Sequence, residues 1–283
     1  MQPSSASTAP DFAMIPEDDE LASVPREIRF FPCETKSPRH LSTQQIQTWN
    51  RDGYLGPLDV FDTQDAAELR VYFDDLLKRT LAAGGDSYSI SSAHMKHGRI
   101  WDLVNQPTIV ASVSDLLGDN VVGWGAHFFC KMPGDGKSVD WHQDCSFWPL
   151  TPTKSVTVWL AIDDADAENG CMEVLRGSHT HGLIGFEKSD VDGGNVLNQS
   201  IRNPEAYGER CQTPIRAGQM SIHSDLLIHG SPANRSQRRR CGLTLRYAPA
   251  DVTAHLGWNA KGVVVRGTAD RQRWPGLPRP EQD

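Results

Sequence analysis

A histidine and an aspartate separated by one residue, His142 and Asp144, are the side chains in this sequence that first suggest metal chemistry. If the segment from Val139 to Asp144 is extended, residues i and i+2 project from the same face, so the two side chains converge while Gln143 points away. An imidazole and a carboxylate make only half of a metal site, and this pair occurs by chance in many chains. A third ligand is needed.

His229 is the best candidate for that third ligand, because it ends an apolar strand predicted from Leu226 to His229, where a polar ring would otherwise lack a role. Two histidines and one carboxylate on one face of a metal leave three coordination positions open, which is the facial triad of non-haem iron(II) oxygenases. The sequence therefore predicts an iron site at His142, Asp144 and His229, where oxygen and a bidentate co-substrate could bind together.

Arg240 lies eleven residues beyond His229 and begins a predicted strand from Cys241 to Tyr247. A guanidinium offers a rigid fork that binds a carboxylate through two hydrogen bonds, and Ser231 could donate another to the same carboxylate. His127 and Lys131 share parity on a predicted strand, so both could point inward toward an oxoacid or a substrate unless a bulge intervenes.

Other histidines compete with the proposed triad. His223 and Asp225 also have the HxD spacing, although a turn at Ser224 and Asp225 would separate their side chains. His179 and His181 lie between glycines, at a predicted turn, and we expect them to be structural.

The combined motifs resemble the phytanoyl-CoA dioxygenase family, over roughly residues 41 to 247. The resemblance is carried by the order of four short segments, which are His142-Gln143-Asp144, Glu168-Asn169-Gly170-Cys171-Met172, Gly177-Ser178-His179, and His229-Gly230-Ser231 followed by Asn234, Ser236 and Arg240. It implies a double-stranded β-helix (jelly-roll, cupin-like) core, with Fe(II) at His142, Asp144 and His229, and the distal carboxylate of 2-oxoglutarate at Arg240 and Ser231.

The resemblance also bears on the reaction and the substrate pocket. Halogenases of this family have a small residue at the position of Asp144 so that chloride can bind iron, so the carboxylate argues for hydroxylation or a related oxidation. In the related ectoine hydroxylases an aromatic residue six positions after the first histidine lines the pocket, and Trp148, next to Phe147, stands there. Arg246 could meet an anionic substrate if it shares the face of Arg240, with a surface salt bridge as the alternative.

The predicted function is hydroxylation of an unactivated C–H bond of a small-molecule metabolite, with conversion of 2-oxoglutarate to succinate and CO2. Fe(II), 2-oxoglutarate and O2 are the expected cofactors and co-substrates, and ascorbate is expected to assist in vitro; no catalytic residue beyond the metal centre is predicted. Two alternatives stay open. The same iron centre could desaturate, cyclise or cleave a C–X bond in secondary metabolism, or the chain could be a noncatalytic metal-binding β-barrel.

Apolar stripes predict the helices that position this site. Ser42 to Gln45 fits a capping box for a helix that ends at Gly53, ahead of a short strand from Tyr54 to Leu58. A longer helix is predicted from Asp62 to Leu81, where apolar residues recur at i, i+3, i+4, i+7 and i+8. A third begins after Pro107 and ends before Gly118.

Beyond residue 121 the pattern changes to short β-like runs between turns. Six strands are predicted, from Val121 to Met132, Ser155 to Ile162, Gly170 to Leu175, Met220 to Ser224, Leu226 to His229 and Cys241 to Tyr247. Strands at this spacing indicate a sandwich or barrel, so we expect a mainly β fold with flanking helices. The segment from Glu187 to Glu209 has no sustained period and is predicted to be a long loop, a typical place for a lid.

Composition sets the broad class of the protein. The 283 residues are 38% hydrophobic and 23% charged, with 24 glycines and 18 prolines, which is typical of a turn-rich globular chain. A net charge of −8 argues against nucleic acid as a partner. Six scattered cysteines, and the lack of an apolar span or signal peptide, favour a cytoplasmic protein without a membrane partner. We expect a flexible arm at residues 1–38 and one domain at 39–283 with a C-terminal extension from about 248, as a monomer or homodimer.

Overall fold

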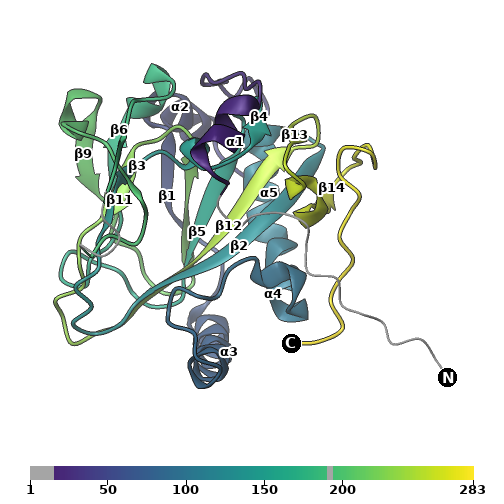
Figure 1. The fold of residues 1–283 in the computed structure, drawn as a ribbon. Coiled ribbons are helices and arrows are strands. Elements are labelled where there is room, and N and C mark those ends of the chain that lie inside the picture. Colours follow the sequence, from purple (N-terminus) through teal and green to yellow (C-terminus); the bar gives the residue numbers. More distant parts are fainter. Residues whose placement is uncertain (1–15, 190–193) are drawn as a thin grey trace.

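Two antiparallel sheets form the centre of the fold, in a computed structural model that describes residues 16–189 and 194–283 (Figure 1). The larger sheet has the strand order β1-β10-β5-β12-β2-β14, and the smaller has the order β3-β11-β6-β9. Their facing surfaces enclose the core of a jelly roll, as predicted. The strands of the larger sheet are β1 (Tyr54–Asp59), β10 (Gln219–Ser224), β5 (Val156–Ala161), β12 (Arg240–Pro249), β2 (Val121–Lys131) and β14 (Val263–Arg266), and those of the smaller sheet are β3 (Val139–His142), β11 (His229–Ser231), β6 (Glu173–Arg176) and β9 (Glu209–Gln212).

Side chains alternate across the larger sheet, and this alternation separates structure from chemistry. On β5, Val156, Val158 and Leu160 belong to the main apolar cluster beneath the helices, whereas Thr157 and Trp159 line the pocket between the sheets. Because the first set is fully buried, each large apolar side chain contributes about 1.5–3 kcal/mol of hydrophobic stabilisation.

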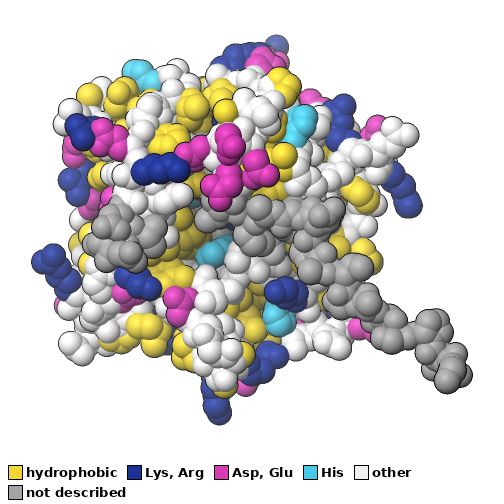
Figure 2. Space-filling model, viewed as in Figure 1, with side chains coloured by type: hydrophobic (Ala, Val, Ile, Leu, Met, Phe, Trp, Pro, Cys, Tyr) yellow, Lys and Arg dark blue, Asp and Glu magenta, His cyan; other side chains and the backbone are white. Residues whose placement is uncertain are grey.

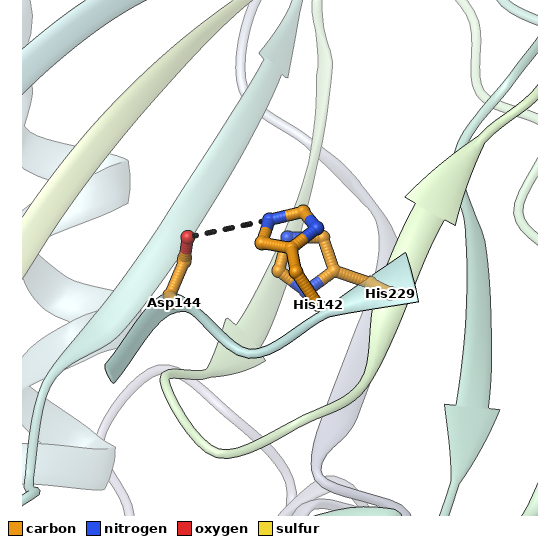
Figure 3. Close-up of side chains that lie close together, drawn as sticks. All are labelled: His142, Asp144 and His229. Carbon is orange, nitrogen blue, oxygen red and sulfur yellow. Dashed lines mark ion pairs between the residues drawn. The ribbon is translucent and has the colours of Figure 1, made fainter. Parts of the chain in front are cut away.

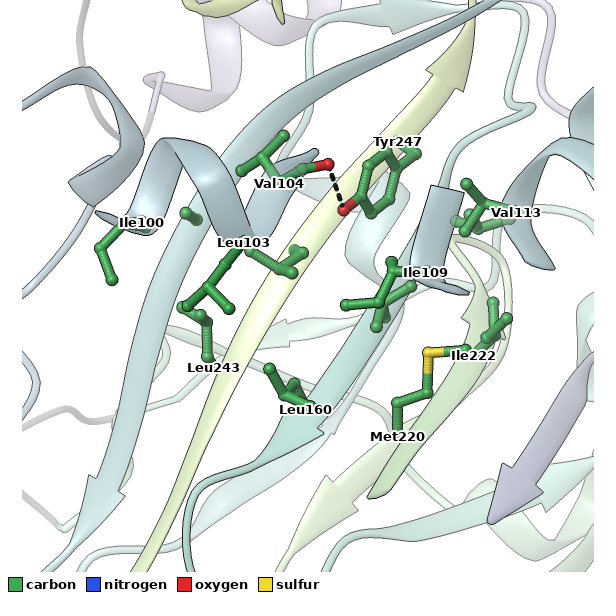
Figure 4. Close-up of a cluster of buried hydrophobic side chains, with 14 of the residues drawn as sticks. Ile100, Leu103, Val104, Ile109, Val113, Leu160, Met220, Ile222, Leu243 and Tyr247 are labelled. Atoms are coloured by element: carbon green, nitrogen blue, oxygen red, sulfur yellow. Dashed lines mark hydrogen bonds between the residues drawn. The ribbon is translucent and has the colours of Figure 1, made fainter. Parts of the chain in front are cut away.

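Four helices contribute to the main apolar cluster on the outer face of the larger sheet, and two of them, α4 (Gly98–Val104) and α5 (Pro107–Leu117), supply side chains shown in Figure 4. A polar contact joins helix and sheet within the cluster, where the Tyr247 hydroxyl donates to the carbonyl of Val104 at 3.0 Å. This packing fixes the backbone of β12, on whose inner face the two site arginines lie. The other clustered side chains are Ile100, Leu103, Ile109, Val113, Leu160, Met220, Ile222 and Leu243.

The three predicted helices are confirmed. In α2 (Thr43–Asp52) the Ser42 hydroxyl accepts from the amide of Gln45, and Gly53 ends the helix with φ +69°. Asp62 caps α3 (Thr63–Ala82), and α5 starts at Pro107. The short helices α4 and α1 (Asp18–Ser23) were not predicted. The 3₁₀ helices are η1 (Ala93–Met95), η2 (Asp144–Ser146), η3 (Ser178–His181), η5 (Pro204–Ala206) and η6 (Trp258–Lys261).

Predicted strand boundaries are correct to within two residues for β1, β2, β5, β10 and β12, but the boundaries of β6 and β11 and the long loop were predicted wrongly. The residues from Leu226 to Ile228 form a turn, and β11 begins at His229 rather than ending there. β6 begins at Glu173, three residues later than predicted. The predicted long loop from Glu187 to Glu209 contains a two-stranded sheet of β7 (Glu187–Lys188) and β8 (Gln199–Ser200) as well as η5.

Both ends of the described chain pack on the sheets. Residues 1–15 of the predicted arm lie outside the described residues, whereas residues 16–38 contain α1 and make long-range contacts. The Arg26 guanidinium donates to the carbonyls of Cys145 and Trp148 at 2.8 and 3.1 Å. Near the other end, the fully buried Trp274 donates to the carbonyl of Val252 at 2.9 Å, beyond the small sheet of β4 (Leu150–Thr151) and β13 (Thr253–Ala254). None of the helices in the described part of the chain combines the length and hydropathy needed to cross a bilayer.

Candidate metal centre

His142, Asp144 and His229 come together between the two sheets (Figure 3). One ligand atom of each lies within 4.8 Å of the others, and all three residues are buried. His142 Nε2 is 3.8 Å from the Asp144 carboxylate, and the two imidazole rings lie 4.2 Å apart between centroids. Among the described residues, this is the group of histidine, cysteine and acidic side chains that could hold a metal ion.

The register of the smaller sheet places the two histidines opposite each other, because His229 of β11 pairs with His142 of β3. Each Nδ1 is hydrogen-bonded to a backbone carbonyl, that of Asp140 at 2.8 Å for His142 and that of Leu227 at 3.0 Å for His229. A carbonyl only accepts hydrogen bonds, so Nδ1 carries the proton and Nε2 keeps its lone pair. Burial lowers the pKa of both rings, which keeps them neutral and able to bind a metal.

Asp144 reaches the site from a turn rather than from a continuous strand, since β3 ends at His142 and Asp144 begins η2. As predicted, the Gln143 side chain still points away from those of His142 and Asp144, because Gln143 is extended, with φ −115° and ψ 131°. Its amide donates to the carbonyls of Gly182 and Leu226 at 2.9 and 2.6 Å, so it fixes the turn.

The Asp144 carboxylate is held by the larger sheet. The Thr157 hydroxyl donates to Oδ2 at 2.7 Å, and His223 Nε2 lies 3.4 Å from the same oxygen. Burial alone would raise the pKa of Asp144, but the neighbouring imidazoles of His223 and His229 lower it below its ordinary value. The carboxylate is therefore ionised and suited to a cation.

The rival pair does not converge. β10 ends at Ser224 and Asp225 lies in the following turn, where its carboxylate accepts from the amide of Ser155 at 3.1 Å. His223 stays beside the triad, with its ring 4.3 Å from that of His229. His179 is buried elsewhere, with Nε2 3.3 Å from the carbonyl of Asn50.

Arg240 lies in the same pocket as the triad and is 2% exposed. Its Nη2 donates to the Ser231 hydroxyl at 3.0 Å, its Nε to the carbonyl of Gly170 at 3.1 Å and its Nη1 to that of Phe129 at 3.5 Å. These bonds use one N–H of each terminal nitrogen, so each keeps a second N–H for a ligand. Arg240 and Ser231 therefore lie together, as predicted. The guanidinium and the hydroxyl can both donate hydrogen bonds to a carboxylate.

Lys131 and His127 lie on the same face of β2, as predicted, but they contact different groups. Lys131 pairs in register with Arg240, and its ammonium donates to the carbonyls of Ser231 (3.1 Å) and Pro232. Burial and the charge of Arg240 lower the pKa of Lys131 to about 6. His127 lines the pocket, and its Nε2 has no hydrogen-bond partner among the described residues.

The pocket that holds these groups has a volume of about 300 Å³. Figure 2 shows this face of the molecule hollowed near its centre, with a histidine side chain visible in the hollow. Phe147, Trp148 and Arg246 line it, so the predicted substrate residues face the same space as the triad. Arg246 is only partly exposed and points into the pocket, so the alternative of a surface salt bridge is wrong.

Several lining residues were not predicted. Thr157 could have been found from the alternation on β5, but Trp124, Trp258, Lys261 and Leu197 reach the pocket through tertiary folding that leaves no local pattern. Leu197 belongs to the predicted lid segment, and residues 190–193 of that segment lie outside the described residues.

The residues present fit an iron(II) ion and an oxoacid. Two neutral imidazole nitrogens and one carboxylate oxygen form the donor set that non-haem iron(II) prefers, with open positions facing the pocket. The Arg240 guanidinium and the Ser231 hydroxyl supply a carboxylate site in the same cavity.

Comparisons with known proteins agree with this geometry. A family model described as phytanoyl-CoA dioxygenase (PhyH) matches residues 49–242. A probable phytanoyl-CoA dioxygenase of Caenorhabditis elegans is 24% identical over 83% of this chain and 84% of its own length. The solved non-heme monooxygenase ThoJ is 25% identical with a TM-score of 0.71, over 84% of this chain and 88% of that one. The carbocyclase SnoK, 22% identical with a TM-score of 0.64 over 77% and 89%, shares the fold. The chain belongs to the phytanoyl-CoA dioxygenase family of iron(II)- and 2-oxoglutarate-dependent dioxygenases.

Proposed function

We propose that this protein hydroxylates an unactivated C–H bond of a small-molecule metabolite, with Fe(II) held by His142, Asp144 and His229. The observation that supports this proposal best is that the three ligand atoms lie within 4.8 Å of one another in the same pocket as Arg240. The overall reaction would convert the substrate, O2 and 2-oxoglutarate to an alcohol, succinate and CO2.

Iron and 2-oxoglutarate supply the oxidising power when bound, and the residues of the chain supply position and shielding. Arg240 and Ser231 bind the distal carboxylate of the oxoacid and so orient its other end toward the triad. The carbonyls of Asp140 and Leu227 fix the imidazole orientation, and Thr157 fixes the carboxylate.

The substrate would lie against the aromatic wall of the pocket. Phe147 and Trp148 follow Asp144 directly, and the ring of Phe147 is 5.9 Å from that of His142, so an apolar substrate segment on this wall would be next to the metal. Leu197 lines the same pocket, which supports a role for the described part of the predicted lid segment in excluding water. The proposal assigns no acid or base outside the metal centre.

The alternative is that the same centre desaturates, cyclises or cleaves a C–X bond. A carbocyclase shares this fold at 22% identity, so the fold does not select among these outcomes. Asp144 argues against halogenation, because a carboxylate ligand occupies the position that chloride would need.

The test is succinate release by purified protein supplied with Fe(II), ascorbate, 2-oxoglutarate and a panel of metabolites. We expect substrate-stimulated succinate formation, abolished by His142→Ala and retained by the exposed control His181→Ala. Product mass then distinguishes a gain of one oxygen from a loss of two hydrogens. Absence of both turnover and metal binding, or full activity of His142→Ala, would refute the proposal.

A further inference from the structure

Two cationic side chains, Arg246 of β12 and Lys261 of η6, line the same pocket as the triad. Arg246 lies on the inner face of β12, six residues beyond Arg240 and next to Thr244 on that face. Arg240 is accounted for by the oxoacid in the proposed function, whereas Arg246 and Lys261 have no role in it. Their surroundings indicate what they bind.

Arg246 lies against aromatic rings rather than against an acid. Its guanidinium carbon is 5.2 Å from the ring centroid of Trp148 and 5.9 Å from that of Trp124. Its Nε is buried and has no hydrogen-bond partner among residues 16–189 and 194–283. A cation–π contact leaves the charge and the donors of the guanidinium available to a ligand.

Lys261 extends the same wall. Its ammonium lies 3.4 Å from the ring centroid of Trp258, and that ring is 5.8 Å from Trp124, which in turn packs edge-on against Trp148 at 4.6 Å. Burial and the charge of Arg246 lower the pKa of Lys261 to about 7. The two cations therefore act on each other across one wall of three indoles.

Burying the Arg246 guanidinium is costly unless an anion offsets its charge. Asp144 is the acidic side chain whose charge acts on Arg246. A divalent metal on the triad would neutralise that carboxylate, and the positive end of the pocket would then face any bound substrate. A guanidinium with free donors in such a place is suited to an oxyanion.

We propose that the substrate carries a carboxylate or an equivalent oxyanion on an apolar body, with Arg246 and Lys261 binding the anion and the wall of Trp124, Trp148 and Trp258 contacting the body. This inference rests on the proposed function, because it takes the occupant of this pocket to be the molecule that is oxidised. It narrows the substrate class from small metabolites in general to anionic ones.

The test compares 4-phenylbutyrate with its neutral amide, 4-phenylbutyramide, as ligands of the protein loaded with Zn(II) and saturating 2-oxoglutarate. Tryptophan fluorescence reports binding, because Trp124, Trp148 and Trp258 line the pocket. We expect the acid to bind about 10-fold more tightly than the amide, because only the acid can form a charge-assisted hydrogen bond with the guanidinium. Arg246→Gln should reduce that ratio to below about threefold, and the exposed control Arg235→Gln should leave it unchanged.

A second measurement needs neither metal nor a fitted ligand. In the metal-free protein, iodide should quench tryptophan fluorescence less in Arg246→Gln than in the wild type by at least about twofold, with quenching by neutral acrylamide unchanged. Equal affinity for acid and amide, or an acid preference that Arg246→Gln retains, would overturn the inference. Displacement of the bound acid by additional 2-oxoglutarate would also overturn it. So would a combined negative result, in which neither the acid nor the amide binds and Arg246→Gln leaves iodide quenching unchanged. If the acid preference and its loss in Arg246→Gln are observed but the wild-type protein shows no turnover, the proposed function is refuted and the inference about the pocket stands.

Discussion

Replacing Arg240 by leucine tests how the co-substrate is recognised. In the structure the guanidinium is 2% exposed and is held by Ser231 and Gly170, so its remaining donors are positioned before any ligand arrives. A paired, charge-assisted interaction with a carboxylate is worth about 3 kcal/mol, which corresponds to about 100-fold in affinity. Arg240→Leu should therefore weaken 2-oxoglutarate binding by about that factor and leave the affinity for the metal within about threefold.

The assay compares 2-oxoglutarate with 2-oxopentanoate, which has the same chain length but no distal carboxylate, in protein loaded with Zn(II). Calorimetry should show that the wild type prefers 2-oxoglutarate by about 100-fold and that Arg240→Leu shows almost no preference. Arg238→Leu is the matched control, because Arg238 is exposed and paired with Asp166 and Glu168. A preference that survives in Arg240→Leu would refute the assignment, whatever the variant does to stability.

Three further perturbations test other contacts. Thr157→Val removes the donor to Asp144 and should weaken zinc binding by about 10-fold in a chelator competition, whereas Thr180→Val, which loses a surface bond, should not. The pKa of Lys131 is lowered to about 6, so the folded state binds fewer protons than the unfolded state between about pH 6 and 10, and this residue makes stability rise with pH in that range. The Tm of Lys131→Met minus that of the wild type should therefore be most positive near pH 6 and decrease toward pH 10; a pH-independent difference would contradict this. Gly242→Ala places a methyl group against the Trp159 indole and should lower the unfolding free energy by about 1–3 kcal/mol, whereas Gly136→Ala, with open space around its Cβ position, should have little effect in the same denaturant titration.

The sequence allowed the helices, the main strands and the three triad residues to be predicted because their signals are local. A capping box at Ser42 or a histidine two residues from Asp144 can be recognised without knowing the rest of the chain. The family resemblance then supplied the jelly-roll fold, which the strand pattern alone left open between a sandwich and a barrel.

What could not be predicted depends on contacts between distant segments. The apolar run from Leu226 to Ile228 looks like a strand, but its residues are buried in a turn, where the Gln143 amide donates to the carbonyl of Leu226. Lys261 and Trp258 follow the last long strand and reach the pocket only because the C-terminal segment folds back over β2. Hydrophobicity alone does not distinguish a buried turn from a buried strand.

The triad spans the two sheets, and this explains why the fold itself can position a metal. His142 and His229 are paired across the smaller sheet, whereas Asp144 is carried by η2 to Thr157 and His223, which are paired in register on the larger sheet. Arg240 and Arg246 project from β12, between these strands and β2. The smaller sheet thus supplies the imidazoles and the larger sheet supplies the groups that hold anions, so the distance between the sheets sets the distance between metal and bound ligands. Apolar packing outside the larger sheet, which includes Tyr247 next to Arg246, keeps that arrangement rigid, and the chemistry of the pocket depends on it as much as on the ligands themselves.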